Sequence, residues 1–302
     1  MFRSFFSRKA VFIGVILAPI LLLIAVFIYY PAVDSFLTSL TNRNLRISRP
    51  PQFILFNNYA TLLSDPQFWQ VIVHSVEVVI LTLPLEMVVG FAIALLLNER
   101  FRGRSLVRTV VLVPWMIPPV VNGFLWGWLL NGDYGALNGL LYQFGLIQED
   151  HSWLQDPQSQ LYWVALVQTW TRFSFPTLIL LAGLQGIPPD LYEAAVVDGA
   201  NVWDSLRRIT FPLLLPSFAI ALIVEFIASF QIFDVIWTLT SGGSAGGAIN
   251  PFTKTLMIYN YELVFRDLRI GLGAALSYLI LLMSMVVGFI FVRRLYNQGI
   301  RE

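Results

Sequence analysis

The sequence predicts an all-α polytopic membrane protein with six transmembrane helices. Of its 302 residues, 57% are hydrophobic and only 12% are charged, and the mean hydropathy is +0.71. Soluble domains contain about 25% charged residues. Six segments reach the roughly 20 mostly apolar residues that a helix needs to cross the hydrocarbon core of a bilayer.

The composition also excludes several classes of protein. The formal net charge is +1, so no global field attracts nucleic acid. The absence of cysteine removes disulfides, thiolate metal sites and cysteine nucleophiles. The two histidines, His74 and His151, do not have the spacing of metal ligands. We therefore expect no metal site.

The predicted spans are divided by polar or proline-containing segments. They cover residues 11–30, 68–97, 107–130, 161–184, 213–239 and 270–292 within a single transmembrane domain, residues 1–302. The first is longer than a signal-peptide core, and we expect an uncleaved anchor. Residues 241–247 are expected to be a flexible connector. Residues 253–265 mix apolar and polar types, which favours a helix at the outer membrane interface.

Orientation follows from the basic residues near the span ends. With the amino terminus inside, twelve arginine and lysine residues are cytoplasmic and six are outside, while Arg172 falls within a span. The cytoplasmic ones are Arg3, Arg8, Lys9, Arg100, Arg102, Arg104, Arg108, Arg207, Arg208, Arg293, Arg294 and Arg301. The outer ones are Arg43, Arg46, Arg49, Lys254, Arg266 and Arg269. This bias predicts a multi-pass protein with both termini cytoplasmic.

A charged segment, residues 188–212, interrupts the apolar pattern between the fourth and fifth spans. Tandem prolines end the fourth span, and we expect Asp190 to cap a new helix, with Glu193 completing a capping box. That helix is expected to end at Gly199, since glycine suits a left-handed C-terminal position. A second helix follows and is expected to break at Pro212. These features alone support an ordinary amphipathic loop helix as well as a docking element.

The residues of this segment form a longer pattern. "EAAVVDGANVWDSLRRITFP" (193–212) resembles the cytoplasmic EAA motif of ABC importer permeases, which has Glu-Ala-Ala, a following glycine and a closing Ile-x-Leu-Pro. The matching residues are Glu193, Ala194, Ala195, Gly199, Ile209 and Pro212. Phe211 stands where the family usually has leucine. The flanking "IPPDLYEAA" and "FDVIWTLTSGG" are similar to the carbohydrate-importing, maltose-type branch, and the resemblance covers all six spans.

The resemblance implies a type I ABC importer permease fold and a set of partners. The EAA segment of that family is a coupling helix that docks on the ATP-binding subunit, which assigns this role to Glu193, Ala194, Ala195, Asp198 and Gly199. The implied partners are a second permease subunit, an ATPase dimer that binds ATP and Mg, and an extracytoplasmic sugar-binding protein. The implied location is the bacterial cytoplasmic (inner) membrane. No Walker-type sequence occurs here, so we expect a transport subunit that is not an enzyme and binds no cofactor.

Polar side chains inside a membrane are costly and are therefore candidates for function. Helical spacing places four residues on one face of the fourth span and three on one face of the fifth. They are Gln168, Thr171, Arg172 and Phe175, followed by Glu225, Ser229 and Ile232. Their amide, guanidinium and carboxylate groups can bind sugar hydroxyls. The resemblance to the larger maltose-importer membrane subunit implies a substrate pathway at these positions and at Trp115 and Pro119.

Other interpretations of these residues stay open. Arg172 and Glu225 could form an ion pair that only holds helices together, and for Glu77 and Glu86 we favour a structural role. An importer of glycerol phosphate or a polyol is the alternative within the family. A pathway rich in Arg and Lys would favour that alternative, but only Arg172 is available, which favours a neutral ligand. A self-contained secondary transporter, with inverted repeats or a proton-relay carboxylate pair, is the alternative from another class.

Overall fold

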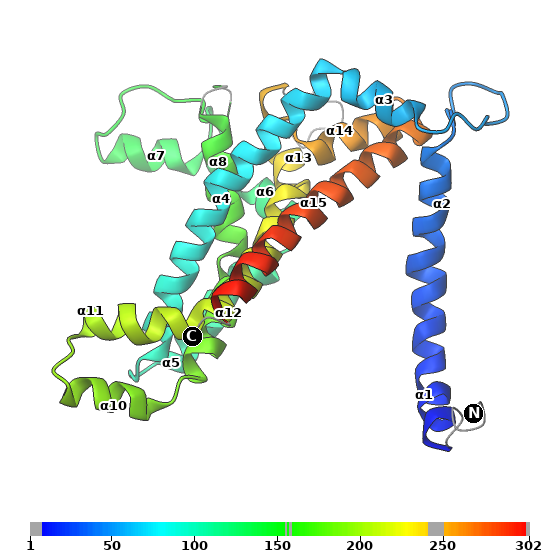
Figure 1. Cartoon of the computed structure of the whole chain (residues 1–302). Helices are drawn as coiled ribbons and strands as arrows, with labels where there is room; N and C mark the ends of the chain where they lie inside the picture. Colours follow the sequence, from blue (N-terminus) through cyan, green and yellow to red (C-terminus); the bar gives the residue numbers. More distant parts are fainter. Residues whose placement is uncertain (1–7, 155, 157–158, 241–250, 300–302) are drawn as a thin grey trace. The chain divides into compact units, whose positions relative to one another are not determined.

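The structure is a computed structural model that describes residues 8–154, 156, 159–240 and 251–299 (Figure 1). The described residues are helical apart from connecting loops and one isolated antiparallel bridge between Thr41 and Phe53. They group into two compact units. The first combines the described parts of Met1–Phe68 and Asn260–Leu281, and the second those of Trp69–Tyr259 and Leu282–Glu302. The predicted connector at 241–247 lies outside the described residues.

The first unit contains the amino-terminal helices. They are α1 (Arg8–Ile24), the π-helical turn η1 (Ala25–Tyr29), α2 (Tyr30–Ser39) and α3 (Asn57–Ser64), with η4 (Glu262–Arg266) and the first part of α15 (Ile270–Gly299). The predicted first span ends at residue 30, whereas the helical run continues to Ser39. Pro31 does not end it, because this proline lies in the first turn of α2, where a missing N–H is tolerated.

The second unit holds most of the remaining helices. They are α4 (Pro66–Asn98), α5 (Arg104–Met116), α6 (Pro119–Leu129), α7 (Ala136–Gln143), α8 (Gln160–Arg172), α9 (Ser174–Gln185), α10 (Pro189–Val197), α11 (Val202–Ser205), η2 (Leu206–Thr210), α12 (Phe211–Phe230), α13 (Asp234–Thr240), η3 (Pro251–Thr253) and α14 (Leu256–Tyr261). The last part of α15 also belongs to this unit.

Four helical runs among the described residues are long and apolar enough to cross a membrane. They are Phe12–Ser39, Pro66–Asn98, Val202–Thr240 and Ile270–Phe291. Two bent pairs pass the same test together, α5 with α6 at 91° and α8 with α9 at 46°. Counting each pair as one span brings the total to six. The predicted spans 107–130 and 161–184 are therefore bent pairs and not straight helices.

Prolines explain the sharp bend between α5 and α6. Pro118 has no N–H to donate to the carbonyl of Pro114, four residues before it. The buried Asn122 supplies a donor instead, since its Nδ2 lies 3.1 Å from the Pro114 oxygen and 3.4 Å from that of Ile117. Inside a bilayer such a replacement is needed because no water reaches the backbone.

The apolar core of the second unit joins α4, α8, α13 and α14. Its buried members are Val78, Val164, Val167, Ile232, Val235, Ile236, Leu239 and Ile258. The predicted interfacial segment 253–265 is largely helical, but Leu256 and Ile258 are fully buried. The Leu256 N–H donates to Ser75 Oγ on α4 at 2.9 Å. This part of the segment therefore packs inside the second unit, and its predicted place at the outer membrane interface stays a prediction.

Gly123 allows α6 and α13 to approach closely. A Cβ at this position would lie 1.6 Å from Thr238 Oγ1 and 2.7 Å from Thr238 Cβ. We predict that Gly123→Ala lowers stability by about 1–3 kcal/mol, the usual cost of over-packing. Thermal unfolding of the purified protein in detergent measures the effect. Gly139→Ala on α7 is the matched control, since a Cβ there meets nothing within 4 Å. Equal unfolding temperatures for the two variants would contradict the close approach.

Candidate functional site

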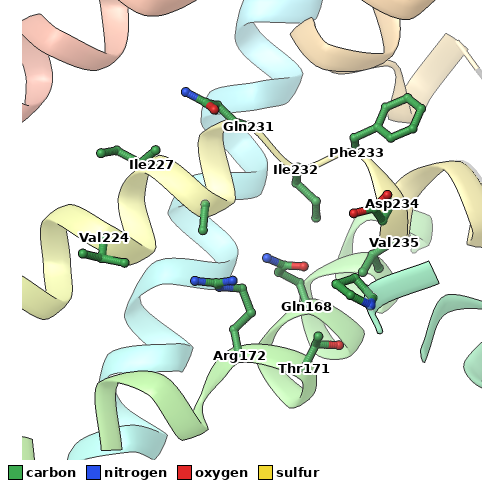
Figure 2. Close-up of a pocket in the computed structure, with 12 residues that line it drawn as sticks. Gln168, Thr171, Arg172, Val224, Ile227, Gln231, Ile232, Phe233, Asp234 and Val235 are labelled. Carbon is green, nitrogen blue, oxygen red and sulfur yellow. The ribbon is translucent and has the colours of Figure 1, made fainter. Parts of the chain in front are cut away.

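A pocket of about 400 Å³ lies between α8 and the end of α12 in the second unit (Figure 2). It presents amide, hydroxyl, guanidinium and carboxylate groups beside aliphatic side chains. Its lining residues are Pro119, Gln168, Thr171, Arg172, Val224, Ile227, Ala228, Gln231, Ile232, Phe233, Asp234 and Val235. Figure 2 shows Arg172 and Gln168 extending from α8 into the space faced by the residues of α12 and α13.

A helix interruption forms one wall of this pocket. α12 ends at Phe230 and α13 begins at Asp234; the Gln231 N–H still donates to the Ile227 carbonyl, but residues 231–233 lie outside both helices. The carbonyl of Ile232 accepts a long hydrogen bond, 3.5 Å, from Thr255 Oγ1. Asp234 lies in the first turn of α13, where the helix dipole favours a negative charge. Non-helical backbone is tolerated at membrane depth where it is buried in protein or lines a cavity.

The expected ion pair between α8 and α12 is present. Arg172 Nε donates to Glu225 Oε2 at 2.6 Å, and Nη2 lies 3.4 Å from Oε1. The Glu225 side chain is fully buried, while 23% of the Arg172 side chain is exposed. Arg172 therefore lines the pocket, and the buried Glu225 holds its guanidinium in place on the side away from the pocket. A side-on contact through two nitrogen atoms fixes the guanidinium plane as well as its position.

A second carboxyl group lies behind this pair. Glu86 on α4 is fully buried, and its Oε2 accepts a hydrogen bond of 3.4 Å from Ser229 Oγ. Its Oε1 is buried without a hydrogen-bond partner among the described residues. Through Ser229, Glu86 adjoins Glu225, which lies one turn earlier on α12. Its predicted structural role stays a prediction. Glu77 is exposed on α4 and lies outside the pocket lining.

The predicted pathway residues divide into those that line the pocket and those that do not. Pro119, Gln168, Thr171, Arg172 and Ile232 line it. Glu225 and Ser229 are buried behind it, and Trp115 and Phe175 form a separate ring contact with centroids 6.3 Å apart. Sequence reasoning did not assign Val224, Ile227, Ala228, Phe233 and Val235, since apolar residues in an apolar span give no signal. Among the described residues, no group of three His, Cys, Asp or Glu side chains could hold a metal ion.

The charged segment 188–212 forms two short helices, α10 and α11, joined at Gly199. Gly199 has φ +80°, its N–H donates to the Val196 carbonyl at 3.1 Å, and the Ala200 N–H donates to that of Ala195 at 2.9 Å. This pair of bonds is a Schellman motif, which confirms the predicted helix end. The hydroxyls of Tyr192 and Thr210 lie 3.0 Å apart and connect α10 to η2.

Two details of the predicted segment are wrong. Asp190 does not cap α10, which begins at Pro189 and has no side-chain cap, because proline already has the φ angle that a first helical turn requires. The second helix does not break at Pro212. It passes through the π-helical turn η2, where the Phe211 N–H donates to the Leu206 carbonyl, and continues as α12. The missing proline N–H is tolerated in the first turn of α12.

The segment exposes large apolar side chains on both sides of Gly199. Val196, Val197, Val202 and Trp203 have relative exposures of 69, 87, 88 and 68%. Glu193, Ala194, Asp198 and Gly199 are also exposed, and Ala195 is half-buried. Contiguous apolar exposure of this kind marks an interaction surface. Sequence reasoning missed these four side chains, although the signal was present as apolar pairs flanking a glycine in a charged segment.

Broken helices around a polar pocket, in a chain with several apolar helical runs, are typical of membrane transport proteins. Residues 86–302 match the family described as binding-protein-dependent transport system inner membrane component, and this chain belongs to that family. The trehalose/maltose transport system permease protein MalF of Thermococcus litoralis is 35% identical over 289 residues, covering 95% of each chain. The sulfoquinovosyl glycerol transport system permease protein SmoG of Agrobacterium fabrum is 34% identical, covering 92% of this chain and 88% of the relative.

A solved structure has the same fold. A chain of a bacterial ABC transporter involved in the import of the acidic polysaccharide alginate superposes with a TM-score of 0.81, at 23% identity and with 96% of both chains covered. The chain thus has the type I ABC importer permease fold that the EAA resemblance implied.

The ion pair gives a prediction about folding. Arg172→Ala leaves Glu225 buried without a counter-charge, which should destabilise the subunit by about 3–5 kcal/mol. The amount of folded protein recovered by size-exclusion chromatography should fall sharply, and Glu225→Gln in the same chain should restore much of it. Arg266→Ala is the control, because it removes an exposed pair with Glu262 that contributes at most about 1 kcal/mol. If the double variant is recovered no better than Arg172→Ala, the pair is not what holds these helices.

Proposed function

We propose that this chain is the permease subunit of an ATP-driven importer and forms half of the translocation path for a sugar. The observation that carries the proposal is the pocket at the α12–α13 interruption. Gln168, Arg172, Gln231 and Asp234 offer several hydrogen-bond donors and acceptors there, beside aliphatic side chains. Sugars have hydroxyl groups and apolar ring faces, and this lining can bind both.

The comparisons support a sugar as the cargo. The two relatives described above, at 34 and 35% identity, carry trehalose/maltose and sulfoquinovosyl glycerol in their names. The trehalose transport system permease protein SugA of Mycobacterium tuberculosis, 32% identical and covering 92% of this chain, supports the same class. We propose that the substrate pathway includes the predicted Trp115, Phe175, Glu225 and Ser229 as supports of the pocket-lining residues.

The energy source in this proposal is a separate ATPase dimer. The exposed segment α10–α11 is its docking element, with Glu193, Ala194, Ala195, Asp198 and Gly199 at the contact and the four exposed apolar side chains around them. ATP and Mg are bound by that partner, and this chain binds no cofactor. A second permease completes the path, and both termini of this chain lie on the ATPase side of the cytoplasmic membrane.

Gly199 offers a test of the docking element. A side chain there would meet nothing within 4 Å, so Gly199→Trp should fit the isolated subunit but obstruct a docked partner. We expect normal amounts in the membrane and at least a tenfold loss of substrate-stimulated ATP hydrolysis. Gly103→Trp is a matched control, with φ +87° and equally open space, because both variants carry the same backbone strain. Normal coupling in Gly199→Trp would refute the docking assignment, as would equal losses in the two variants.

Dependence on a binding protein gives a second test. Proteoliposomes containing this chain, its partner permease and the ATPase should hydrolyse ATP slowly, and should accelerate only with sugar-loaded binding protein on the outer face. We expect that protein to dock on the outer loops at 131–160 and 242–265. Sugar uptake without ATP and without the binding protein, at the full rate, would identify a channel or secondary carrier and overturn the proposed function.

A further inference from the structure

The pocket and the cluster behind it contain more carboxyl groups than cations. Arg172 is the one basic side chain in the lining and is already paired with Glu225. Asp234 also lines the pocket, and Figure 2 shows its carboxylate on the side that faces the cavity. Among the described residues, Asp234 takes part in no ion pair within 4.0 Å. Glu86 adds a third carboxyl group in contact with Ser229.

We propose that this pocket admits sugars that are neutral or carry an ammonium group and excludes those that carry a carboxylate, sulfonate or phosphate, with Asp234 setting the preference at the pocket surface. The inference rests on the proposed function for the identity of the ligand as a sugar. The preference for charge rests only on the arrangement of Arg172, Glu225 and Asp234. Two of the proteins compared above are named for anionic cargo, the sulfonate sulfoquinovosyl glycerol and the acidic polysaccharide alginate, and the proposed preference would distinguish this chain from them.

Two costs oppose an anionic ligand. An anion in the pocket meets the Asp234 carboxylate across a space from which water is partly excluded, where like charges repel more strongly than in bulk water. An anion that binds Arg172 competes with Glu225 for the guanidinium. If Glu225 loses Arg172, a fully buried carboxylate is left without its cation. A neutral hydroxyl group incurs neither cost, because it can bind Arg172 without displacing Glu225.

The absence of cysteine from the sequence allows a direct test of the electrostatic potential in the pocket. Ala228→Cys places a single thiol in the pocket lining. Its reaction rates are measured at pH 9.0 in membranes holding the assembled transporter, with three methanethiosulfonates: the ethyltrimethylammonium cation, the ethylsulfonate anion and the neutral methyl reagent. The cation-to-anion rate ratio is divided by the same ratio for a small free thiol. Because both reagents attack the same thiolate, its degree of ionisation cancels.

We expect a normalised ratio well above one. Asp234→Asn in the same chain should lower it by about three- to tenfold, the effect of removing one nearby charge. Glu77→Gln is the matched control, since it removes a carboxylate on α4 that does not line the pocket, and should leave the ratio unchanged.

Three results would overturn the proposal. One is a normalised ratio at or below one, which would mean that Arg172 dominates the field. Another is an equal effect of Asp234→Asn and Glu77→Gln. The third is failure of the neutral reagent to reach either Ala228→Cys or a second reporter, Gln231→Cys, since the pocket would then be closed to ligands. None of these readings depends on sugar uptake, so failure of the proposed function would be recognised separately in the proteoliposome assay.

Discussion

The structure depends most on the need to satisfy every backbone hydrogen bond where water is absent. An unpaired N–H or C=O in hydrocarbon costs several kcal/mol, so each helix break must be compensated locally. Asn122 does this for the carbonyl that Pro118 leaves free. Thr255 contributes a long bond to the carbonyl of Ile232 at the α12–α13 interruption. Both breaks contribute to the pocket lining, the first through Pro119 and the second through residues 231–234. The need to satisfy backbone hydrogen bonds therefore also positions the pocket.

Charge inside the second unit follows a related rule. Arg172 and Glu225 are tolerated at membrane depth because each is the other's partner, with Nε and Oε2 2.6 Å apart. The pair joins α8 to α12 and also gives the pocket its only basic group among the lining residues. In the proposed function, a guanidinium held in place by a buried carboxylate is also a preorganised donor for a sugar hydroxyl, so the structural and functional roles of Arg172 are not alternatives.

In the segment between α9 and α12, local hydrogen bonds hold α10 against the helical run that leads into α12. Gly199 ends α10 with a Schellman motif, and the hydroxyl contact between Tyr192 and Thr210 ties α10 to the turn that precedes α12. Because η2 carries the helix through Pro212 without interruption, α11, η2 and α12 form one continuous helical run, within Val202–Thr240. This run leads from the exposed α11 to Phe230, directly before the interruption that lines the pocket.

The sequence by itself determined the membrane class, the approximate positions of the apolar segments, the helix end at Gly199 and the family. Each of these follows from local chemistry: hydropathy, span length, the left-handed conformation open to glycine, and a long contiguous motif. It also predicted the pairing of Arg172 with Glu225, because few partners exist for a charge inside a span. Only the tertiary structure decided that α5 and α6 meet at 91°, that η2 bypasses Pro212 and that α14 is buried. Only the structure showed that Glu86 adjoins Glu225 through Ser229 while Trp115 and Phe175 lie outside the pocket lining. These features depend on which distant side chain compensates a broken backbone bond or a buried charge, and spacing along one chain contains no information on that choice.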